Sequence, residues 1–215
     1  MSLDPETARK KVRCMTNPTP RPFVVALGGT LKPDSSTEKA LVLALKGAEA
    51  VGAEVKLIAG AQLDMPLFNP STSDRCDAAR EMVETLRRAD GIILGSPGYH
   101  GSISGLVKNA LDYTEDMRED ENPYFHGRPV GSVATGAGWQ GAVNTLTALR
   151  NIVHALRGWN TPMGVAINTA EPVFAADGTC PDSKIATMLE QMGREIATAA
   201  RARNILELAK ADHDA

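Results

Sequence analysis

A long loop rich in glycine, proline and serine is the first place in this chain where the residue types suit chemistry. It runs from Gly95 to Gly105, with the sequence GSPGYHGSISG, and follows the apolar run 91–94. Glycine lets a backbone come close to a flat ligand, and the amides of such a loop can point at the ligand's polar edge. At the carboxyl end of a parallel strand, a loop of this kind is where open α/β sheets bind ligands.

The loop at 29–37, with the sequence GTLKPDSST, indicates a phosphate site. It places a cation, Lys32, and four hydroxyl groups just before an expected helix: Thr30, Ser35, Ser36 and Thr37. Hydroxyls, backbone amides and the positive end of a helix dipole suit a terminal phosphate. Neither GxGxxG nor GxxxxGK[ST] occurs here, which argues against a dinucleotide fingerprint and a P-loop. A simpler interpretation stays open, in which a serine only caps the helix and Lys32 is only a surface charge.

Five short apolar segments alternate with segments of helical spacing. The predicted strands are 23–27, 54–58, 91–95, 129–134 and 162–167. Helical apolar repeats occur over 41–48, 79–86, 106–113, 143–156 and 185–196. This alternation predicts an α/β fold, a three-layer sandwich in which helices cover both faces of a five-stranded parallel sheet.

The expected strand order places three loops at one crevice. In the flavodoxin-like order 2-1-3-4-5, the crevice lies between strands 1 and 3, with strand 4 beside them. Strand 4 is followed by a third loop of small residues, TGAGWQG, which runs from Thr135 to Gly141. Turns that were purely structural would have no reason to gather at one crevice, so we expect a ligand site there.

Composition limits the classes of function. With 215 residues, 43% of them hydrophobic, we expect one domain over 23–209 between an N-terminal leader, 1–22, and a C-terminal tail, 210–215. The net charge of −3 argues against a nucleic-acid or membrane-surface partner. The cysteines Cys14, Cys76 and Cys180 form no ligand cluster, so we expect neither a metal site nor a disulfide framework. No membrane span or secretory signal is recognisable, so a cytoplasmic protein is expected.

Two of the loops carry motifs of a known family. The stretch from Gly29 to Ser35 is similar to the phosphate loop G-S-L-R-x-x-S of the NADPH-dependent FMN reductase family, with Thr for Ser and Lys for Arg. The stretch from Ser96 to Asp112 resembles the longer and more specific signature T-P-E-Y-N-x-S-x-P-G-x-L-K-N-x-x-D. The family is flavodoxin-like and includes flavin, quinone and azo-dye reductases. The resemblance covers about residues 23–200.

The resemblance implies a site for FMN. Its phosphate would lie against Thr30, Lys32, Ser35, Ser36 and Thr37. Its ring would follow Pro97, Gly98, Tyr99, His100, Gly101, Ser102 and Ile103. The third wall would be Thr135, Gly136, Gly138 and Gly141. Gly98, His100 and Ser104 depart from the family's Glu, Asn and Pro, which leaves the electron acceptor open.

The implied reaction needs no catalytic side chain, because the flavin carries the chemistry. NADPH or NADH would deliver a hydride, and free flavin, a quinone or another small aromatic molecule would accept the electrons. The resemblance also implies a homodimer or homotetramer, with the helix after Gly105 near the interface. Two other classes stay open: a flavodoxin-type electron carrier that does not oxidise NAD(P)H, and a non-catalytic binding domain. Carriers are usually more acidic than this chain, which argues against the first.

Overall fold

The computed structural model describes residues 21–214, so most of the predicted leader lies outside the described residues. The longer strands are β1 (Phe23–Gly28), β2 (Glu54–Ile58), β3 (Gly91–Tyr99), β5 (Pro129–Gly136) and β7 (Val165–Asn168). The helices are α2 (Ser36–Glu49), α3 (Asp77–Arg88), α4 (Gly105–Asp112), α5 (Trp139–Ala155) and α6 (Ser183–Asp214), with two short 3-10 turns, η1 (Gly60–Leu63) and η2 (Tyr113–Met117). The alternation confirms the predicted α/β class.

The parallel strands follow the predicted order 2-1-3-4-5, but the sheet has seven strands. Its order is β2-β1-β3-β5, followed by two short strands that both pair with β5: β6 (Trp159–Asn160) and β7. The prediction of one fifth strand over 162–167 is therefore wrong in its detail. Pro162 has no amide hydrogen to donate to the ladder, and the chain leaves the sheet between β6 and β7. The seventh strand, β4 (Ser102–Ile103), pairs antiparallel with β3.

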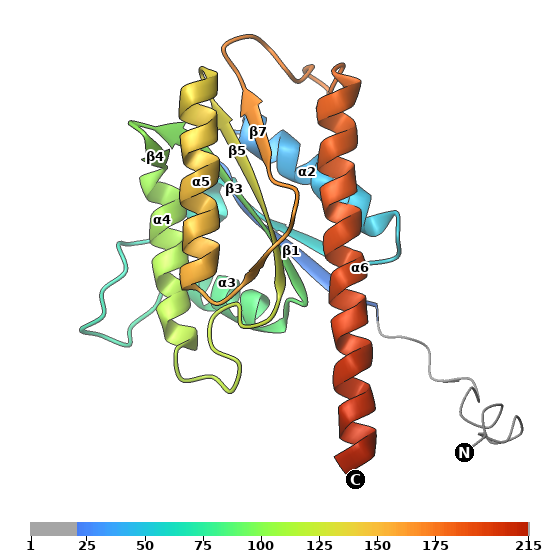
Figure 1. The fold of residues 1–215 in the computed structure, drawn as a ribbon. Coiled ribbons are helices and arrows are strands. Elements are labelled where there is room, and N and C mark those ends of the chain that lie inside the picture. Colours follow the sequence, from blue (N-terminus) through green and yellow to red (C-terminus); the bar gives the residue numbers. More distant parts are fainter. Residues whose placement is uncertain (1–20, 215) are drawn as a thin grey trace, which may run out of the picture.

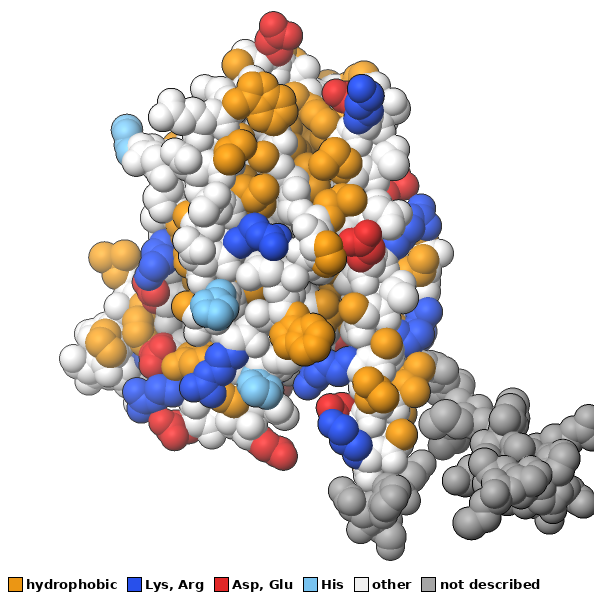
Figure 2. Space-filling model, viewed as in Figure 1, with side chains coloured by type: hydrophobic (Ala, Val, Ile, Leu, Met, Phe, Trp, Pro, Cys, Tyr) orange, Lys and Arg blue, Asp and Glu red, His pale blue; other side chains and the backbone are white. Residues whose placement is uncertain are grey.

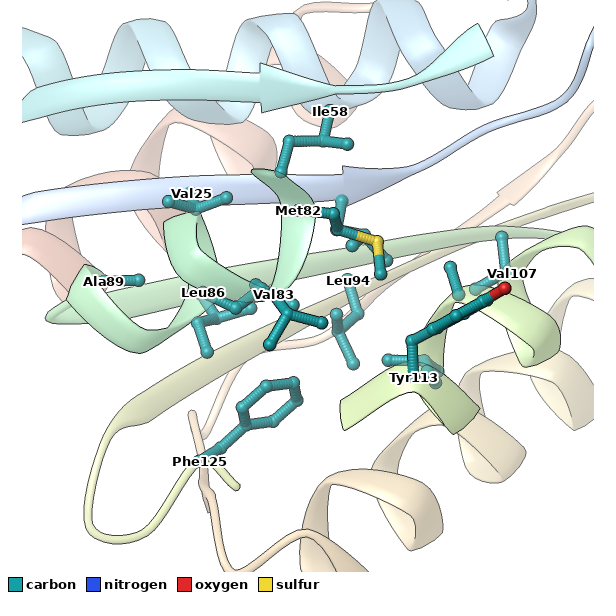
Figure 3. Packing of buried hydrophobic residues seen from close by; sticks show 14 of the residues in the cluster. Val25, Ile58, Met82, Val83, Leu86, Ala89, Leu94, Val107, Tyr113 and Phe125 are labelled. Atoms are coloured by element: carbon teal, nitrogen blue, oxygen red, sulfur yellow. The ribbon is translucent and has the colours of Figure 1, made fainter. Parts of the chain in front are cut away.

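Helices cover both faces of the sheet (Figure 1). On one face, residues of the sheet pack against α3, α4 and α5, and Figure 3 shows part of this core, including Val25, Leu86, Leu94 and Phe125. On the other face, a second buried cluster joins the sheet to α2 and α6. These two apolar layers confirm the three-layer sandwich.

The helices α2 and α6 contact each other backbone to backbone. A Cβ atom on Gly193 would overlap the carbonyl oxygen of Ala44, and one on Gly47 would overlap that of Glu190. Glycine permits this close approach because it has no Cβ. The contact holds α2 in place on the sheet, and α2 begins directly after the loop predicted to bind phosphate.

The last helix is longer than the sequence predicts. Residues 210–214, assigned to a tail from the sequence, continue α6 in the structure. The domain boundaries at 23 and 209 stay a prediction. Within the described residues, no helix combines the length and apolarity needed to cross a bilayer. No group of three or more His, Cys, Asp or Glu side chains suited to a metal ion occurs in that same part of the chain.

Candidate active site

The three loops border one cavity at the carboxyl ends of β1, β3 and β5. Its volume is about 610 Å³, within the range of roughly 300–1,000 Å³ that is usual for cofactor and small-molecule sites. The predicted site residues that line it are Thr30, Lys32, Ser35, Ser36, Thr37, Pro97, Gly98, Tyr99, Thr135 and Gly136. Residues far apart in the sequence thus meet where the strand order reverses, as expected for this type of sheet.

The structure also changes the membership of the site. The lining residues that the sequence did not single out are Leu31, Asp34, Ala137 and Thr169. Three of them fall inside the predicted loops, and the fourth follows β7, the strand beside β5. The predicted site residues outside the lining are His100, Gly101, Ser102, Ile103, Gly138 and Gly141.

Where β1 ends, directly before the first loop of the cavity, β1 and β3 approach each other more closely than side chains would allow. Gly28 has a φ of 149°, and a Cβ atom there would overlap the carbonyl oxygen of Gly95. The amide of Gly29 donates to that same oxygen at 3.2 Å. Glycine is therefore required at position 28, both for its conformation and for the space around it.

The predicted phosphate loop is ordered by its own hydroxyl groups. The amide of Lys32 donates to the Thr30 hydroxyl at 3.1 Å. Ser35 caps α2, because its hydroxyl oxygen accepts from the amide of Glu38 at 3.3 Å. Capping uses the hydroxyl as an acceptor and leaves its hydrogen free to donate to a ligand. The helix cap and a ligand contact at Ser35 are thus compatible.

Two buried threonines join the first and third loops. The hydroxyls of Thr37 and Thr135 lie 2.7 Å apart, and both residues are buried. In such a pair one hydroxyl donates to the other, and the acceptor keeps its own hydrogen for another partner. This contact fixes the start of α2 against the end of β5 and leaves one donor for the cavity.

Charge is sparse among the lining residues. Lys32 and Asp34 are the basic and acidic side chains among them, and both are exposed. The remaining polar groups are neutral hydroxyls and backbone, next to the N-terminus of α2. The first amides of a helix and its dipole attract an anion without any buried charge. This end of the cavity therefore suits a phosphate group.

Part of the stretch from Gly95 to Gly105, which the sequence predicts as a loop, forms a short β-hairpin in the structure. β3 continues to Tyr99, and Tyr99 pairs with Ser102 of β4. The two residues between them, His100 and Gly101, have φ values of 52° and 90°. Two-residue hairpins favour positive φ at both positions, and His and Asn adopt it more readily than most residues. His100 therefore serves the turn and does not line the cavity.

A buried serine explains why Ser104 stands where the family has proline. The amide of Ser104 donates to the hydroxyl of Ser96 at 2.9 Å, and the Ser104 hydroxyl accepts from the amide of Val107 at 3.2 Å as the cap of α4. A proline at 104 would have neither the amide hydrogen nor the hydroxyl. Ser96 in turn donates to the carbonyl oxygen of Pro97 at 2.9 Å. Ser96 is thus a positioning residue that was not predicted from the sequence.

Helix α5 explains the glycine at position 98, where the family has glutamate. A Cβ atom on Gly98 would overlap the hydroxyl of Thr145 and lie 3.0 Å from the carbonyl oxygen of Gly141. The Thr145 hydroxyl donates to the carbonyl oxygen of Ser102 at 3.3 Å. The hairpin thus rests directly on α5, and a larger side chain at 98 would force them apart.

The third wall is also built on a close backbone contact. A Cβ atom on Gly136 would lie 2.7 Å from the amide nitrogen of Ala142. The amide of Thr169 donates to the carbonyl oxygen of Gly136 at 2.8 Å, which brings the end of β7 to the cavity. Gly138 precedes α5 with a φ of 127° and offers no side-chain cap. The first turn of α5 therefore keeps amide donors near this wall.

The part of the family signature that lies on α4 has a structural role and does not line the cavity. The side-chain oxygen of Asn109 accepts from the amide of Phe68 at 2.9 Å, and its amide group donates to the carbonyl oxygens of Met65 and Pro66. Lys108 and Asp112 form an ion pair on the exposed side of the same helix. The motif thus holds the loop after η1 against α4.

The chain matches one family model over most of its length. The model describes the NADPH-dependent FMN reductases and matches residues 22–172, which include all three loops of the cavity. This chain belongs to the NADPH-dependent FMN reductase family. The match confirms the resemblance found in the loop motifs.

A sequence relative carries a more specific name. An FMN-dependent NADPH-azoreductase of Staphylococcus aureus is 35% identical to the present chain over 118 residues. The match covers 55% of this chain and 59% of the relative, so the chain spans less than two thirds of the length of the relatives that it matches.

Solved structures of similar fold show the same architecture. FerB, a flavoenzyme NAD(P)H:(acceptor) oxidoreductase from Paracoccus denitrificans, has a TM-score of 0.69 at 23% identity, covering 84% of this chain and 98% of FerB. An NADH:FMN oxidoreductase, EMOB, has a TM-score of 0.60 at 20% identity, covering 82% of this chain and 89% of that one. At these sequence identities, the structural similarity shows the fold alone.

Proposed function

We propose that this chain is an FMN-dependent NAD(P)H oxidoreductase that reduces a small aromatic acceptor, such as free flavin, a quinone or an azo compound. The observation that carries the proposal is the cavity where the strand order of the sheet reverses. One end of this cavity has a loop that resembles a phosphate-binding loop, and the other end has small residues. Family membership and the name of the Staphylococcus aureus relative support it. A homo-oligomer is part of the same proposal.

The residues present fit FMN. Thr30, Lys32 and the start of α2 would hold the phosphate through hydroxyls, a cation and helix amides. Gly136 and Ala137 leave space for a flat ring, since neither has a bulky side chain. When bound, FMN would supply the hydride and electron chemistry, taking a hydride from NADPH or NADH. The chain itself would bind and orient the cofactor and leave one ring face open.

Tyr99 stands at the rim of this cavity. It is 54% exposed and lines the cavity from the end of β3. An aromatic face beside a flat cofactor can pack against a second planar molecule. We therefore infer that Tyr99 contacts the acceptor or the nicotinamide, which share the open side of the site.

The first experiment is to purify the full chain and record its visible spectrum with and without added FMN. We expect bound flavin, and oxidation of NADPH or NADH in the presence of flavin, quinone and azo acceptors. Bound FMN without NAD(P)H oxidation would indicate an electron carrier. A protein that binds no FMN under any condition would contradict the proposal and favour a binding domain of another kind.

A pair of lysine variants tests the phosphate loop. Lys32→Ala removes the cation of the cavity, and we expect the dissociation constant of FMN to rise about tenfold, because an exposed charge contributes roughly 1–1.5 kcal/mol. Lys46→Ala removes an exposed lysine from the last turn of α2 and is the matched control. Equal FMN affinities of the two variants, measured by flavin fluorescence, would remove Lys32 from the site.

A further inference from the structure

The last helix forms one wall of a groove at the end of the sheet opposite the candidate active site. The buried side chains of α6 end at Ala200, and Figure 1 shows the helix extending past the sheet. The residues of α6 that line the groove follow one another at spacings of three and four: Ala199, Ala202, Arg203, Leu206, Glu207 and Lys210. We call this surface the α6–β6 groove.

The opposite wall is built where β5 and β6 begin to pair. Pro129 is paired with Trp159, and the amide of Trp159 donates to the carbonyl oxygen of Arg128 at 2.8 Å. The amide of Gly127 donates to the carbonyl oxygen of Arg157 at 3.2 Å, which joins the same two segments. Trp159 is nonetheless 73% exposed. Its backbone is thus fixed while its ring stays available to a ligand.

The α6–β6 groove has the size and the apolar lining of a small-molecule site. Its volume is about 460 Å³, within the range of roughly 300–1,000 Å³ that is usual for such sites. Leu206, on the wall formed by α6, is 62% exposed. Figure 2 shows hydrophobic and basic side chains next to each other around the lower part of α6. Exposed apolar area of this kind marks an interaction site.

One guanidinium group at the groove has no partner. Two residues earlier on α6, Arg201 donates to the carbonyl oxygen of Val51 at 2.6 Å. The side chain of Arg203, although partly buried, makes no ion pair and donates no hydrogen bond within residues 21–214. Its Nε atom lies 3.6 Å from the place that a Cβ atom on Gly127 would take, so the guanidinium lies against the opposite wall. Its unused donors suit an anion.

The other charges of the groove are already balanced. Lys210 pairs with Glu207 at 3.3 Å, which leaves Arg203 as the lining cation without a counter-charge. Asn122 and His126, both exposed, supply further polar groups. One unpaired positive charge between apolar walls suits a ligand that carries one negative charge on an apolar body.

We propose that the α6–β6 groove binds a small aromatic monocarboxylate, whose carboxylate accepts from the guanidinium of Arg203 and whose ring packs against Trp159. A guanidinium binds a carboxylate through two parallel N–H···O bonds. An indole ring pairs favourably with a second aromatic ring. The site goes beyond the proposed function, because the groove and the candidate active site share no lining residue.

A buried neighbour of Arg203 favours the same ligand. Arg128 is 6% exposed, and burial lowers its pKa. The charge of Arg203 lowers the pKa of Arg128 further, which shows that the two guanidinium groups repel each other. A carboxylate bound to Arg203 would offset this repulsion.

Titration of the full chain with 2-naphthoate tests the proposal. The chain has two tryptophans, so Trp139→Phe assigns the indole N–H signal of Trp159 in the NMR spectrum. We expect 2-naphthoate to shift this signal to saturation, with a dissociation constant below about 1 mM. The uncharged 2-naphthamide should bind at least tenfold more weakly. No saturable shift, as when another chain or segment covers Trp159, or equal affinities of the two probes, would overturn the proposal.

A pair of arginine variants tests the carboxylate contact. Arg203→Gln removes the unpaired charge, and we expect the dissociation constant of 2-naphthoate to rise about tenfold. Arg194→Gln, on the same helix but outside the groove, is the matched control and should bind 2-naphthoate as the wild type does. Wild-type affinity of the Arg203→Gln variant would overturn the proposal.

FMN titration separates this site from the candidate active site. Arg203 does not line the cavity at the carboxyl ends of the strands, so Arg203→Gln should leave the dissociation constant of FMN unchanged. Saturating FMN should also leave the Trp159 shift by 2-naphthoate in place. Displacement of 2-naphthoate from Trp159 by FMN would overturn this inference. A chain that binds 2-naphthoate at Trp159 but binds no FMN would contradict the proposed function alone.

Discussion

The two ends of the sheet are built in different ways. At the carboxyl ends of the strands, the cavity is lined mainly by glycine, alanine and hydroxyl residues, and backbone lies against backbone at Gly28 and Gly136. At the opposite end, the groove between α6 and β6 is lined by Trp159, Leu206 and charged side chains of α6, and α6 extends beyond the sheet (Figure 1). One end is lined by small and polar residues that suit a cofactor, and the other exposes large apolar side chains.

The two ends of the sheet should differ in how well they tolerate amino-acid substitutions. Where backbone packs on backbone, an added methyl group has nowhere to go, because the main chain of both partners must move. Where long side chains meet solvent, neighbours can adjust and the cost is small. We therefore expect substitutions at the close backbone contacts of the cavity end to lower the free energy of unfolding far more than substitutions of exposed side chains at the groove end.

The largest effect is expected at Gly28. Gly28→Ala places a Cβ atom onto the carbonyl oxygen of Gly95 and a side chain at a φ of 149°. We expect a loss of about 3 kcal/mol or more in the free energy of unfolding, measured in urea. Gly141→Ala, in open space on α5, is the control at the same end and should be neutral or slightly stabilising.

The corresponding substitution at the groove is Leu206→Ala. Because Leu206 is 62% exposed, this substitution should change the unfolding free energy by no more than about 0.5 kcal/mol. If Leu206→Ala destabilised the protein as much as Gly28→Ala, the contrast between the two ends would be wrong.

A smaller effect is expected at Ser104. Ser104→Pro restores the family residue but removes the amide donor to Ser96 and the cap of α4, so we expect a loss of about 2 kcal/mol in the free energy of unfolding. Ser104→Ala removes only the cap and should cost about 1 kcal/mol. Equal stabilities of the two variants in thermal unfolding would show that the amide contact with Ser96 is unimportant.

The smallest effect is expected at His100. His100→Asn suits the positive φ of the hairpin turn, so stability should change by less than about 0.5 kcal/mol. FMN affinity should stay within about twofold, because His100 does not line the cavity. His100→Val, which is β-branched, should lose roughly 1–2 kcal/mol at the same position. A large drop in FMN affinity with His100→Asn would return this residue to the site.

Much of the cavity could be predicted from local sequence. Apolar runs followed by glycine and hydroxyl residues place the loops at strand ends, and the parallel order then brings three of them together. Thr30, Ser35 and Thr135 were predicted as site residues in this way and line the cavity. Thr169 was missed because it follows β7, and its place depends on how β7 pairs with β5.

The turn and the fifth strand were harder to predict. The glycine-rich stretch after Gly95 has the composition of a loop, yet Tyr99 and Ser102 pair across it. Pairing of this kind depends on the support from Thr145 of α5, which lies more than forty residues away in the sequence. In the fifth strand, Pro162 was placed inside a strand although it cannot donate to a ladder.

The sequence by itself determined the α/β class, the parallel order and the three loops, because hydrophobic periodicity and glycine-rich strand ends are local properties. Only the tertiary structure decided which loop residues line the cavity, that the loop after Gly95 is a hairpin and that α6 extends past the sheet. Each of these depends on contacts between distant segments. Gly98 illustrates the reason: its lack of a side chain is understandable only once Thr145 is seen beside it.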